Sequence, residues 1–220
     1  MDGRGLRGER TRKAVAVGAA AIASVDGLSG MTLGQLGESL GLSKSSVQAA
    51  YGTKEEVQLA AVASATAIFV SAVVAPAQQA APGLARLLAL VDAWLAYVER
   101  RVFPGGCFMV ATLAEFDSRP GPVRDALARA RRGWLSTLER QAATAQTAGV
   151  IPATPAAEMV AFEIDALLAA ANVSRNLSDD TAPLVAVRAL IALRLGIAER
   201  DDGPDQIDRS GRPVRPILES

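Results

Sequence analysis

Polar and basic side chains that can contact the bases of nucleic acids lie close together between residues 44 and 48. Lys44, Ser45 and Gln48 fall on the side of a predicted short helix that faces away from its apolar residues Val47 and Ala50. In a major groove, lysine pairs with guanine and glutamine with adenine through the donors and acceptors on the base edges. These residue types at this spacing therefore indicate recognition of duplex DNA.

A second set of residues has the chemistry of phosphate contacts and surrounds the first. It consists of hydroxyl groups near helix starts, a lysine that opens the following helix, and an aromatic residue between them. Together, the two sets give the DNA-binding residues that we predict: Thr32, Ser43, Lys44, Ser45, Ser46, Gln48, Ala49, Tyr51 and Lys54.

Two helices joined by a tight turn are needed to position these side chains. Helical spacing of three leucines predicts the first helix over Leu33, Leu36 and Leu40. Thr32 and Ser43 are suitable N-caps for the first and second helix, and Gly41 suits the left-handed turn between them. Gly37 has no side chain where the two helices approach each other. The pattern is typical of a helix-turn-helix, although an ordinary helical hairpin with no role in DNA binding has the same spacing.

Read with their neighbours, these residues resemble the tetracycline-repressor (TetR) family of bacterial transcriptional regulators. The resemblance begins at Arg12, follows an alanine-rich helix to Gly27, and continues through the turn GLSKSSV, Tyr51 and the segment TKEEV. PGGCF at 104–108 and EFDSRPGPVRD at 115–125 look like segments of one branch of the family. The resemblance implies an all-α chain with an N-terminal three-helix helix-turn-helix DNA-binding domain and a C-terminal helical ligand-binding and dimerisation domain.

Some positions depart from the family pattern. Gln48 stands where a tyrosine usually contacts a phosphate, and Ala49-Ala50 replaces a pair that is usually bulkier. Ala23 replaces the usual phenylalanine of the first helix, and Gly18 a common alanine. These changes remove one phosphate contact and reduce the core of the DNA-binding domain.

Composition restricts the other functions that are open to the chain. It has no histidine and one cysteine, Cys107, so histidine-based catalysis and most transition-metal sites are excluded, and the chain suits a reducing cytoplasm. Glu115 and Asp117 are two residues apart and do not share a helix face, so we predict no enzyme, cofactor or metal. No apolar run is expected to approach the ~18–20 residues of a membrane span.

The remainder of the chain is predicted to form helices separated by proline and glycine, over about 54–75, 83–101, 107–116, 121–148, 155–176 and 180–198. Aromatic residues gather on the middle helices, where they line a cavity or simply fill the core. The predicted ligand-binding residues are Trp94, Tyr97, Phe103, Cys107, Phe108, Phe116 and Trp134. They favour an uncharged or aromatic small-molecule effector.

The last two helices are apolar on more than one side, which indicates burial on more than one face. We therefore predict a homodimer through about 155–198; the alternative is that these helices fill the monomer core. The expected organisation is a disordered basic arm (1–9), the helix-turn-helix domain (10–53), the effector and dimerisation domain (54–198) and a disordered tail (199–220).

The predicted function is that of a dimeric DNA-binding repressor, released from a near-palindromic operator by a small, mostly apolar ligand. The alternative is a helical dimeric interaction or ligand-binding module that no longer binds specific DNA.

Overall fold

The computed structural model describes residues 3–197, and the side chains from residue 8 onward. The elements in chain order are α1 (Gly3–Gly30), α2 (Leu33–Ser39), α3 (Lys44–Tyr51), α4 (Lys54–Phe69), the π-helical turn η1 (Val70–Val74), α5 (Ala75–Ala77), α6 (Leu84–Glu99), α7 (Phe108–Phe116), α8 (Pro122–Thr147), α9 (Ala157–Ser178) and α10 (Ala182–Arg194). The described residues contain no strand, and the predicted all-α fold class is confirmed.

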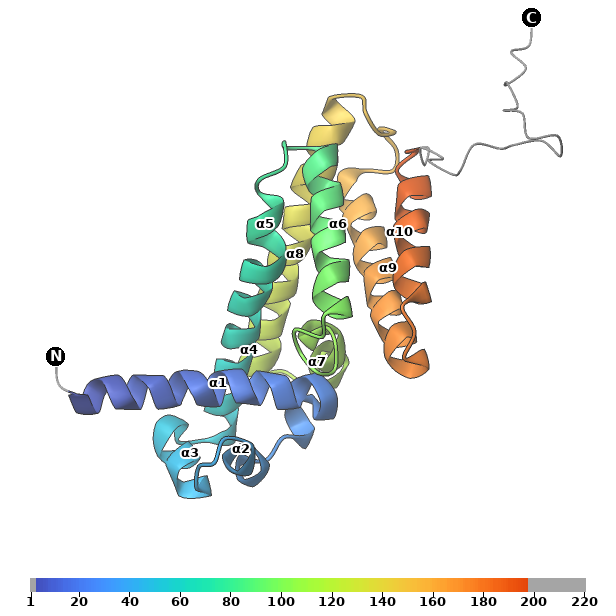
Figure 1. Ribbon diagram of the computed structural model, residues 1–220. Coiled ribbons are helices and arrows are strands. Elements are labelled where there is room, and N and C mark those ends of the chain that lie inside the picture. Colours follow the sequence, from blue (N-terminus) through green and yellow to red (C-terminus); the bar gives the residue numbers. More distant parts are fainter. Residues whose placement is uncertain (1–2, 198–220) are drawn as a thin grey trace, which may run out of the picture.

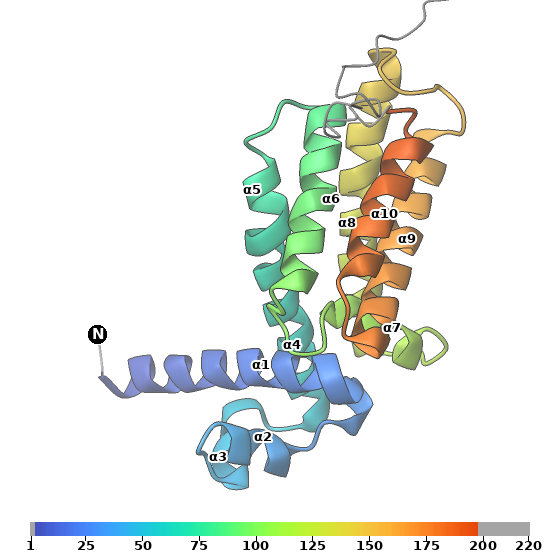
Figure 2. The same cartoon turned by 45° about the vertical axis from the view of Figure 1, so that its right-hand side comes forward.

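The helices form a small head and a larger body. Helices α1–α3 make up the head at one end of the molecule, and the long helices of the body stand side by side above it (Figure 1 and Figure 2). Helix α1 lies across the end of the body and packs against α4 and α7. The head therefore touches the body mainly through α1, and α3 makes a smaller contact with α4.

The body helices form where apolar residues recur at helical spacing. In α6 one face is buried, with Leu87, Val91, Trp94 and Val98 at most 3% exposed. Burying such a stripe stabilises the helix because apolar area is removed from water. The observed bounds of α6 to α9 lie within two residues of those predicted, whereas α10 ends at Arg194, before the predicted 198.

The helix that connects head and body is longer than predicted. We expected it to end before Pro76, but it continues to Ala77 through the π-helical turn η1. In this turn the Ala75 N–H donates to the Val70 carbonyl five residues earlier. The wider turn shifts the hydrogen-bond register just before Pro76, which has no N–H to donate, so the helix passes the proline without ending.

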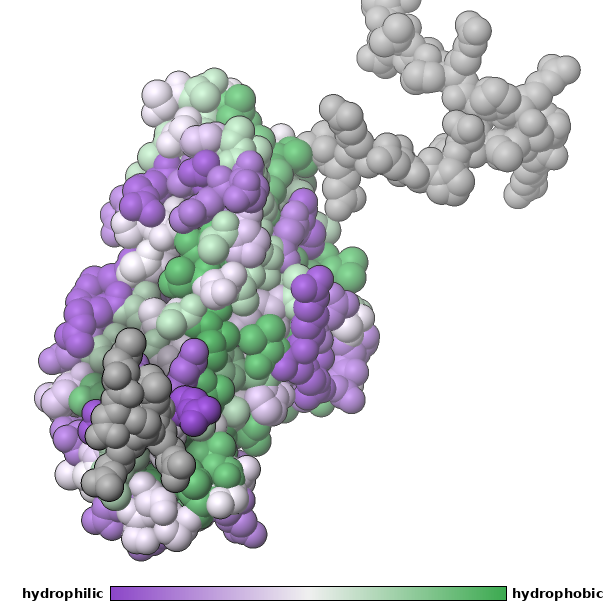
Figure 3. All heavy atoms as spheres, turned by 60° about the vertical axis from the view of Figure 1, so that its left-hand side comes forward, coloured by the Kyte–Doolittle hydropathy of each residue, from purple (hydrophilic) through white to green (hydrophobic). Residues whose placement is uncertain are grey.

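This continuous helix also corrects the expectation that no segment is long and apolar enough to span a membrane. Lys54–Ala77 has 24 residues and an 18-residue window of mean hydropathy 2.1. One such helix is weak evidence for a span, because core helices pass the same test of length and composition. Here the helix packs against α1 and α8. A groove of about 530 Å³, lined mostly by small and apolar residues, runs between α1 and α4. Figure 3 shows hydrophobic surface on this side of the molecule.

The predictions for the two ends of the chain have different outcomes. Helix α1 begins at Gly3, so residues 3–9 are helical where the sequence suggested a disordered arm. The predicted tail, 199–220, lies outside the described residues.

Candidate functional site

The turn between α2 and α3 is built as the sequence predicts. The Thr32 side chain accepts a hydrogen bond from the Gln35 N–H, and the Ser43 side chain accepts one from the Ser46 N–H. Gly41 has φ +64°, the left-handed region that favours glycine. Each helix of the pair therefore has a side-chain cap at its start.

Gly37 is packed against the turn and the start of α3, since a Cβ on it would also lie 3.4 Å from Lys44 N. Its carbonyl accepts the N–H groups of Leu40 and Leu42, and a Cβ placed on it would lie 2.7 Å from the Leu42 carbonyl oxygen. The close approach predicted at Gly37 is therefore between two stretches of backbone. Gly18 has a related role in α1, since a Cβ there would lie 3.1 Å from Leu40 Cδ2.

One face of α3 points into solvent. Val47 is fully buried against the head, whereas Lys44, Ser45, Gln48 and Ala49 are exposed. The Ser43 hydroxyl lies 2.8 Å from the hydroxyls of both Ser45 and Ser46, so three hydroxyl groups gather at the start of α3. Seven of the nine predicted DNA-binding residues are thus exposed around α3 and the start of α2, and within the described part of the chain their side chains make no hydrogen bond beyond this turn.

The remaining two, Tyr51 and Lys54, are held by bonds within the protein. The Tyr51 hydroxyl donates to the Arg12 carbonyl at 2.9 Å, while the Arg12 Nε donates to the Ala50 carbonyl at 2.8 Å. Partial burial raises the pKa of Tyr51, against the opposing effect of the Arg12 charge. Lys54 Nζ donates to the Ser29 carbonyl at 2.7 Å. The hydrogen bonds of these two side chains link α3 and α4 to α1. The local sequence does not predict these bonds.

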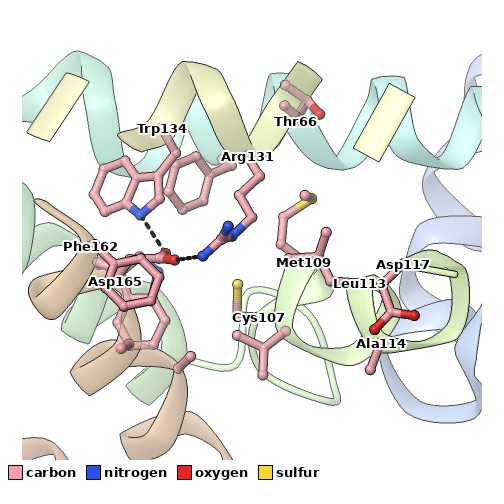
Figure 4. A pocket seen from close by; sticks show the side chains of 16 residues that line it. Thr66, Cys107, Met109, Leu113, Ala114, Asp117, Arg131, Trp134, Phe162 and Asp165 are labelled. Atoms are coloured by element: carbon pink, nitrogen blue, oxygen red, sulfur yellow. Dashed lines mark hydrogen bonds and ion pairs between the residues drawn. The ribbon is translucent and has the colours of Figure 1, made fainter. Parts of the chain in front are cut away.

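The body contains a pocket of about 470 Å³. Its wall comes from α4, α6, α7, α8 and α9 (Figure 4). The lining residues are Thr66, Phe69, Trp94, Cys107, Met109, Val110, Leu113, Ala114, Asp117, Ala130, Arg131, Trp134, Phe162, Asp165, Ala166 and Ala169. An apolar cavity with a few polar groups is the usual form of a small-molecule site.

The polar groups of the pocket form a connected set. Asp165 accepts a hydrogen bond from Arg131 Nη2 at 2.8 Å and another from Trp134 Nε1 at 3.1 Å (Figure 4). Each carboxylate oxygen of Asp165 therefore has one partner, and the Trp134 ring is fixed in orientation. Among the described residues, no group of three or more His, Cys, Asp or Glu side chains is placed to hold a metal ion.

Three of the seven predicted ligand-binding residues line this pocket: Trp94, Cys107 and Trp134. Tyr97, Phe103 and Phe108 are instead core residues, each at most 3% exposed, and they pack on one another edge to face or tilted. Phe116 lines a smaller neighbouring hollow. The presence of an aromatic residue on a helix therefore does not indicate whether its side chain lines the cavity or lies in the core behind the cavity wall.

Burial also determines the chemistry of Cys107 in the pocket wall and of Tyr97 behind it. It raises the pKa of the Cys107 thiol to about 11, so the thiol is neutral at physiological pH. It likewise raises the pKa of the Tyr97 hydroxyl. Cys107 thus contributes a small, neutral surface to the pocket.

Sequence reasoning missed several pocket residues. Phe69 packs edge to face on Trp134 with ring centroids 5.1 Å apart, and Phe162 and Arg131 complete the same end of the pocket. The helical periodicity around 127–138 indicates which side of α8 is buried, but it does not indicate which helices of the body face one another.

Helix α7 joins the pocket to the head. One face of it supplies Leu113 and other pocket residues, and another face presents Glu115 to α1. Glu115 accepts the N–H groups of Leu28 and Ser29, each at 2.8 Å, just after Gly27 breaks the helix with φ +74°. A charged acceptor makes these hydrogen bonds stronger than neutral ones.

The loop before α7 adds a second link between head and body. Gly105 N–H donates to the Ser24 hydroxyl of α1 at 3.0 Å. On the other side of the loop, Cys107 N–H donates to Asn172 Oδ1 of α9 at 2.9 Å. The pocket, the end of α1 and helix α9 therefore meet around one short segment.

The profile of the tetracyclin repressor-like C-terminal domain (TetR_C_13) matches residues 83–191. Among curated proteins, none matches the sequence. A TetR regulator from Chloroflexus aurantiacus J-10-FL is 23% identical, with a TM-score of 0.79, over 86% of this chain and 96% of that one.

Two further structures have the same fold. A TetR-family regulator from Cytophaga hutchinsonii is 23% identical, with a TM-score of 0.75, over 86% of this chain and 95% of that one. AibR, solved in complex with isovaleryl coenzyme A and operator DNA, is 16% identical, with a TM-score of 0.69, over 84% of this chain and 98% of that one. The helix-turn-helix head and the helical body define a class, that of helical transcriptional regulators. The chain belongs to the tetracycline-repressor family of transcriptional regulators.

Proposed function

We propose that this regulator is a dimeric, DNA-binding repressor of the cytoplasm, without enzymatic activity, that leaves its operator when a small ligand binds. The main observation in support is the head: a capped helix pair whose second helix presents Lys44, Ser45 and Gln48 to solvent. A recognition helix of this kind reads base edges, while hydroxyl and amide groups at helix starts bind phosphates. In our proposal Lys44 and Gln48 contact bases, and Ser43, Ser46 and Thr32 contact the backbone.

Dimerisation is supported by the outer surface of α9 and α10. Large hydrophobic side chains are exposed along both helices: Met159, Phe162, Val173, Leu177, Val185, Leu190 and Leu193. Their spacing places those of α9 on one face of that helix, and leaving so much apolar surface in water is unfavourable. A second copy that covers this face would bring two heads together, each able to enter one of two successive major grooves about 34 Å apart.

Release by a ligand is supported by the position of α7. This helix forms part of the pocket wall and also binds the end of α1 through Glu115. A ligand that fits the pocket best when α7 is displaced would favour a head arrangement that does not match the operator. One structural neighbour was solved with both an acyl-CoA and operator DNA, so the fold accommodates both.

A module without specific DNA binding is the second candidate function. It is favoured by Gln48 in place of a phosphate-binding tyrosine, and by the internal bonds of Tyr51 and Lys54. Fewer side chains then remain to contact phosphates.

The test is selection of bound duplexes from a random DNA pool, followed by titration of the selected site by fluorescence anisotropy. We expect a near-palindromic sequence and an affinity that falls as salt rises. Lys44→Ala should reduce discrimination between selected and random DNA by about 1–3 kcal/mol. Arg140→Ala, on the exposed surface of α8 in the body, is the matched control and should change nothing. Enrichment of no sequence would support the second candidate, and unchanged discrimination in Lys44→Ala would remove the base contact assigned to that residue.

A further inference from the structure

The ligand pocket adjoins a second, smaller hollow between α7 and α8. This hollow has a volume of about 260 Å³ and is lined by Leu113, Phe116, Asp117, Arg124, Leu127, Ala128, Arg131, Arg132 and Leu135. Leu113, Asp117 and Arg131 line both spaces. One molecule can therefore contact both if it extends past Arg131.

The two spaces differ in character. The pocket is walled mostly by apolar residues, including both tryptophans of the chain, Trp94 and Trp134. The hollow carries three guanidinium groups, those of Arg124, Arg131 and Arg132, and one carboxylate, that of Asp117. The combined site is thus apolar at one end and carries three arginines at the other, where Arg131 is ion-paired with Asp165 and Arg124 with Asp125, so that Arg132 is the one without an ion-pair partner among the described residues.

The guanidinium groups retain hydrogen-bonding capacity. Arg131 donates to Asp165 through Nη2, and no other bond of this side chain is found among the described residues. Arg124 donates to the Asp117 carbonyl at 3.0 Å and lies 3.6 Å from Asp125, in an exposed pair. Arg132 is exposed and has no ion-pair partner within the described part of the chain. Most N–H donors of these three arginines therefore remain for an incoming group.

We propose that the effector is an amphipathic anion, with an apolar tail in the pocket and a phosphate or carboxylate head group on Arg131 and Arg132, with Arg124 at the rim. The inference rests on the ligand site of the proposed function and names its ligand class. Planar guanidinium groups bind phosphate and carboxylate oxygens through paired hydrogen bonds, whereas the tail is removed from water among aromatic rings. Arg132 supplies the charge that no carboxylate of the described residues pairs with, and Arg131 has further N–H donors besides the one that binds Asp165.

The experiment uses the two tryptophans as reporters, because both line the pocket. Their fluorescence can be measured on the protein alone, without DNA. Octyl phosphate, octanoate, octylamine, octanol and inorganic phosphate are titrated into the full chain below any micelle concentration, and tryptophan fluorescence is followed. Octyl phosphate or octanoate should bind about ten-fold more tightly than octylamine, because charge-assisted hydrogen bonds form only with the anions. The comparison of the two anions identifies the head group. Inorganic phosphate should give no saturable change, because it has no tail.

Variants separate the two ends of the site. Arg132→Gln should weaken octyl phosphate about ten-fold and leave octanol unchanged, whereas Arg140→Gln, on α8 but outside both linings, should change neither. Ala130→Phe fills the pocket and should weaken every octyl compound. Circular dichroism confirms that each variant is folded.

The outcomes distinguish this inference from the proposed function. Tighter binding of octylamine than of both anions would overturn the inference and leave a ligand-responsive regulator intact. Equal binding of all the octyl compounds, or an Arg132→Gln variant with normal anion affinity, would also overturn it. If no compound binds, both this inference and the ligand part of the proposed function fail, whereas the DNA selection described above is unaffected.

Discussion

At the scale of single residues, Gly37 and Cys107 show how close packing restricts a position. Gly37 lies against the backbone of the turn that follows α2, and Cys107 is a fully buried thiol at the pocket wall. Neither restriction follows from the residue type alone. Each leads to a prediction about one side chain.

Gly37→Ala should destabilise the protein by about 1–3 kcal/mol, because the new methyl group meets a backbone carbonyl that cannot move without opening the turn. Gly34→Ala, in the same helix, is the matched control. A Cβ there has only Thr32 Oγ1 within 4 Å, so alanine should stabilise α2 by about 0.5–1 kcal/mol. Urea unfolding followed by circular dichroism measures both; a Gly37→Ala variant as stable as the parent would contradict the packing described.

Cys107 should react with iodoacetamide at pH 8 about 100-fold more slowly in the folded protein than in urea, because its raised pKa and burial leave little thiolate. The same pKa has a consequence for stability. The unfolded thiol ionises first as pH rises above its ordinary pKa near 9, so the free energy of unfolding falls from there toward pH 11. The Cys107→Ala variant should lack this part of the pH dependence. Fast alkylation of the folded protein would show that the thiol is accessible.

At the scale of elements, α7 is the short helix that contacts both the pocket and the head. It forms pocket wall on one side and binds the backbone at the end of α1 through the Glu115 carboxylate. The π-helical turn in the long connecting helix is a second local feature, and it ends just before Pro76.

Glu115→Gln should weaken the link between α7 and α1, because an amide has one acceptor oxygen where the carboxylate has two. We expect the amide protons of Leu28 and Ser29 to exchange about ten-fold faster, which hydrogen exchange measured by NMR detects. Asp117→Asn removes a carboxylate from the same segment but no hydrogen bond to the head, and it should leave that exchange unchanged. Equal protection in Glu115→Gln and the parent would show that the carboxylate does not hold this end of α1.

At the scale of the whole molecule, the exposed apolar face of α9 and α10 determines the expected assembly. Leu177 is 84% exposed and Leu193 is 76% exposed in the single chain. A stable interface buries about 800 Å² on each partner, which two helices with large side chains can supply.

Replacing Leu177 and Leu193 together by aspartate should convert the dimer to a monomer, because two charges on each copy would have to be buried at the interface. Multi-angle light scattering at micromolar concentration measures the mass directly. Val150→Asp, at an exposed apolar position in the loop before α9, is the control and should remain dimeric. A parent chain with the mass of a monomer would end the dimer proposal.

The sequence by itself determined the features that depend on neighbouring residues. The caps at Thr32 and Ser43, the left-handed turn at Gly41 and the bounds of α6 to α9 follow from hydrogen bonds and apolar spacing within a few residues, so a local pattern contains the information. The exposed face of α3 follows in the same way, because the one buried residue of that helix, Val47, fixes its orientation.

Only the tertiary structure decided which of the aromatic residues line the pocket and which fill the core. The pocket joins residues from Thr66 to Ala169 on five helices, and the pairing of Arg131 with Asp165 spans 34 positions. The internal bonds of Tyr51 and Lys54 likewise depend on where α1 crosses the later helices. Such contacts are set by how whole helices pack, and helical periodicity fixes which side of a helix is buried but not which helix it meets.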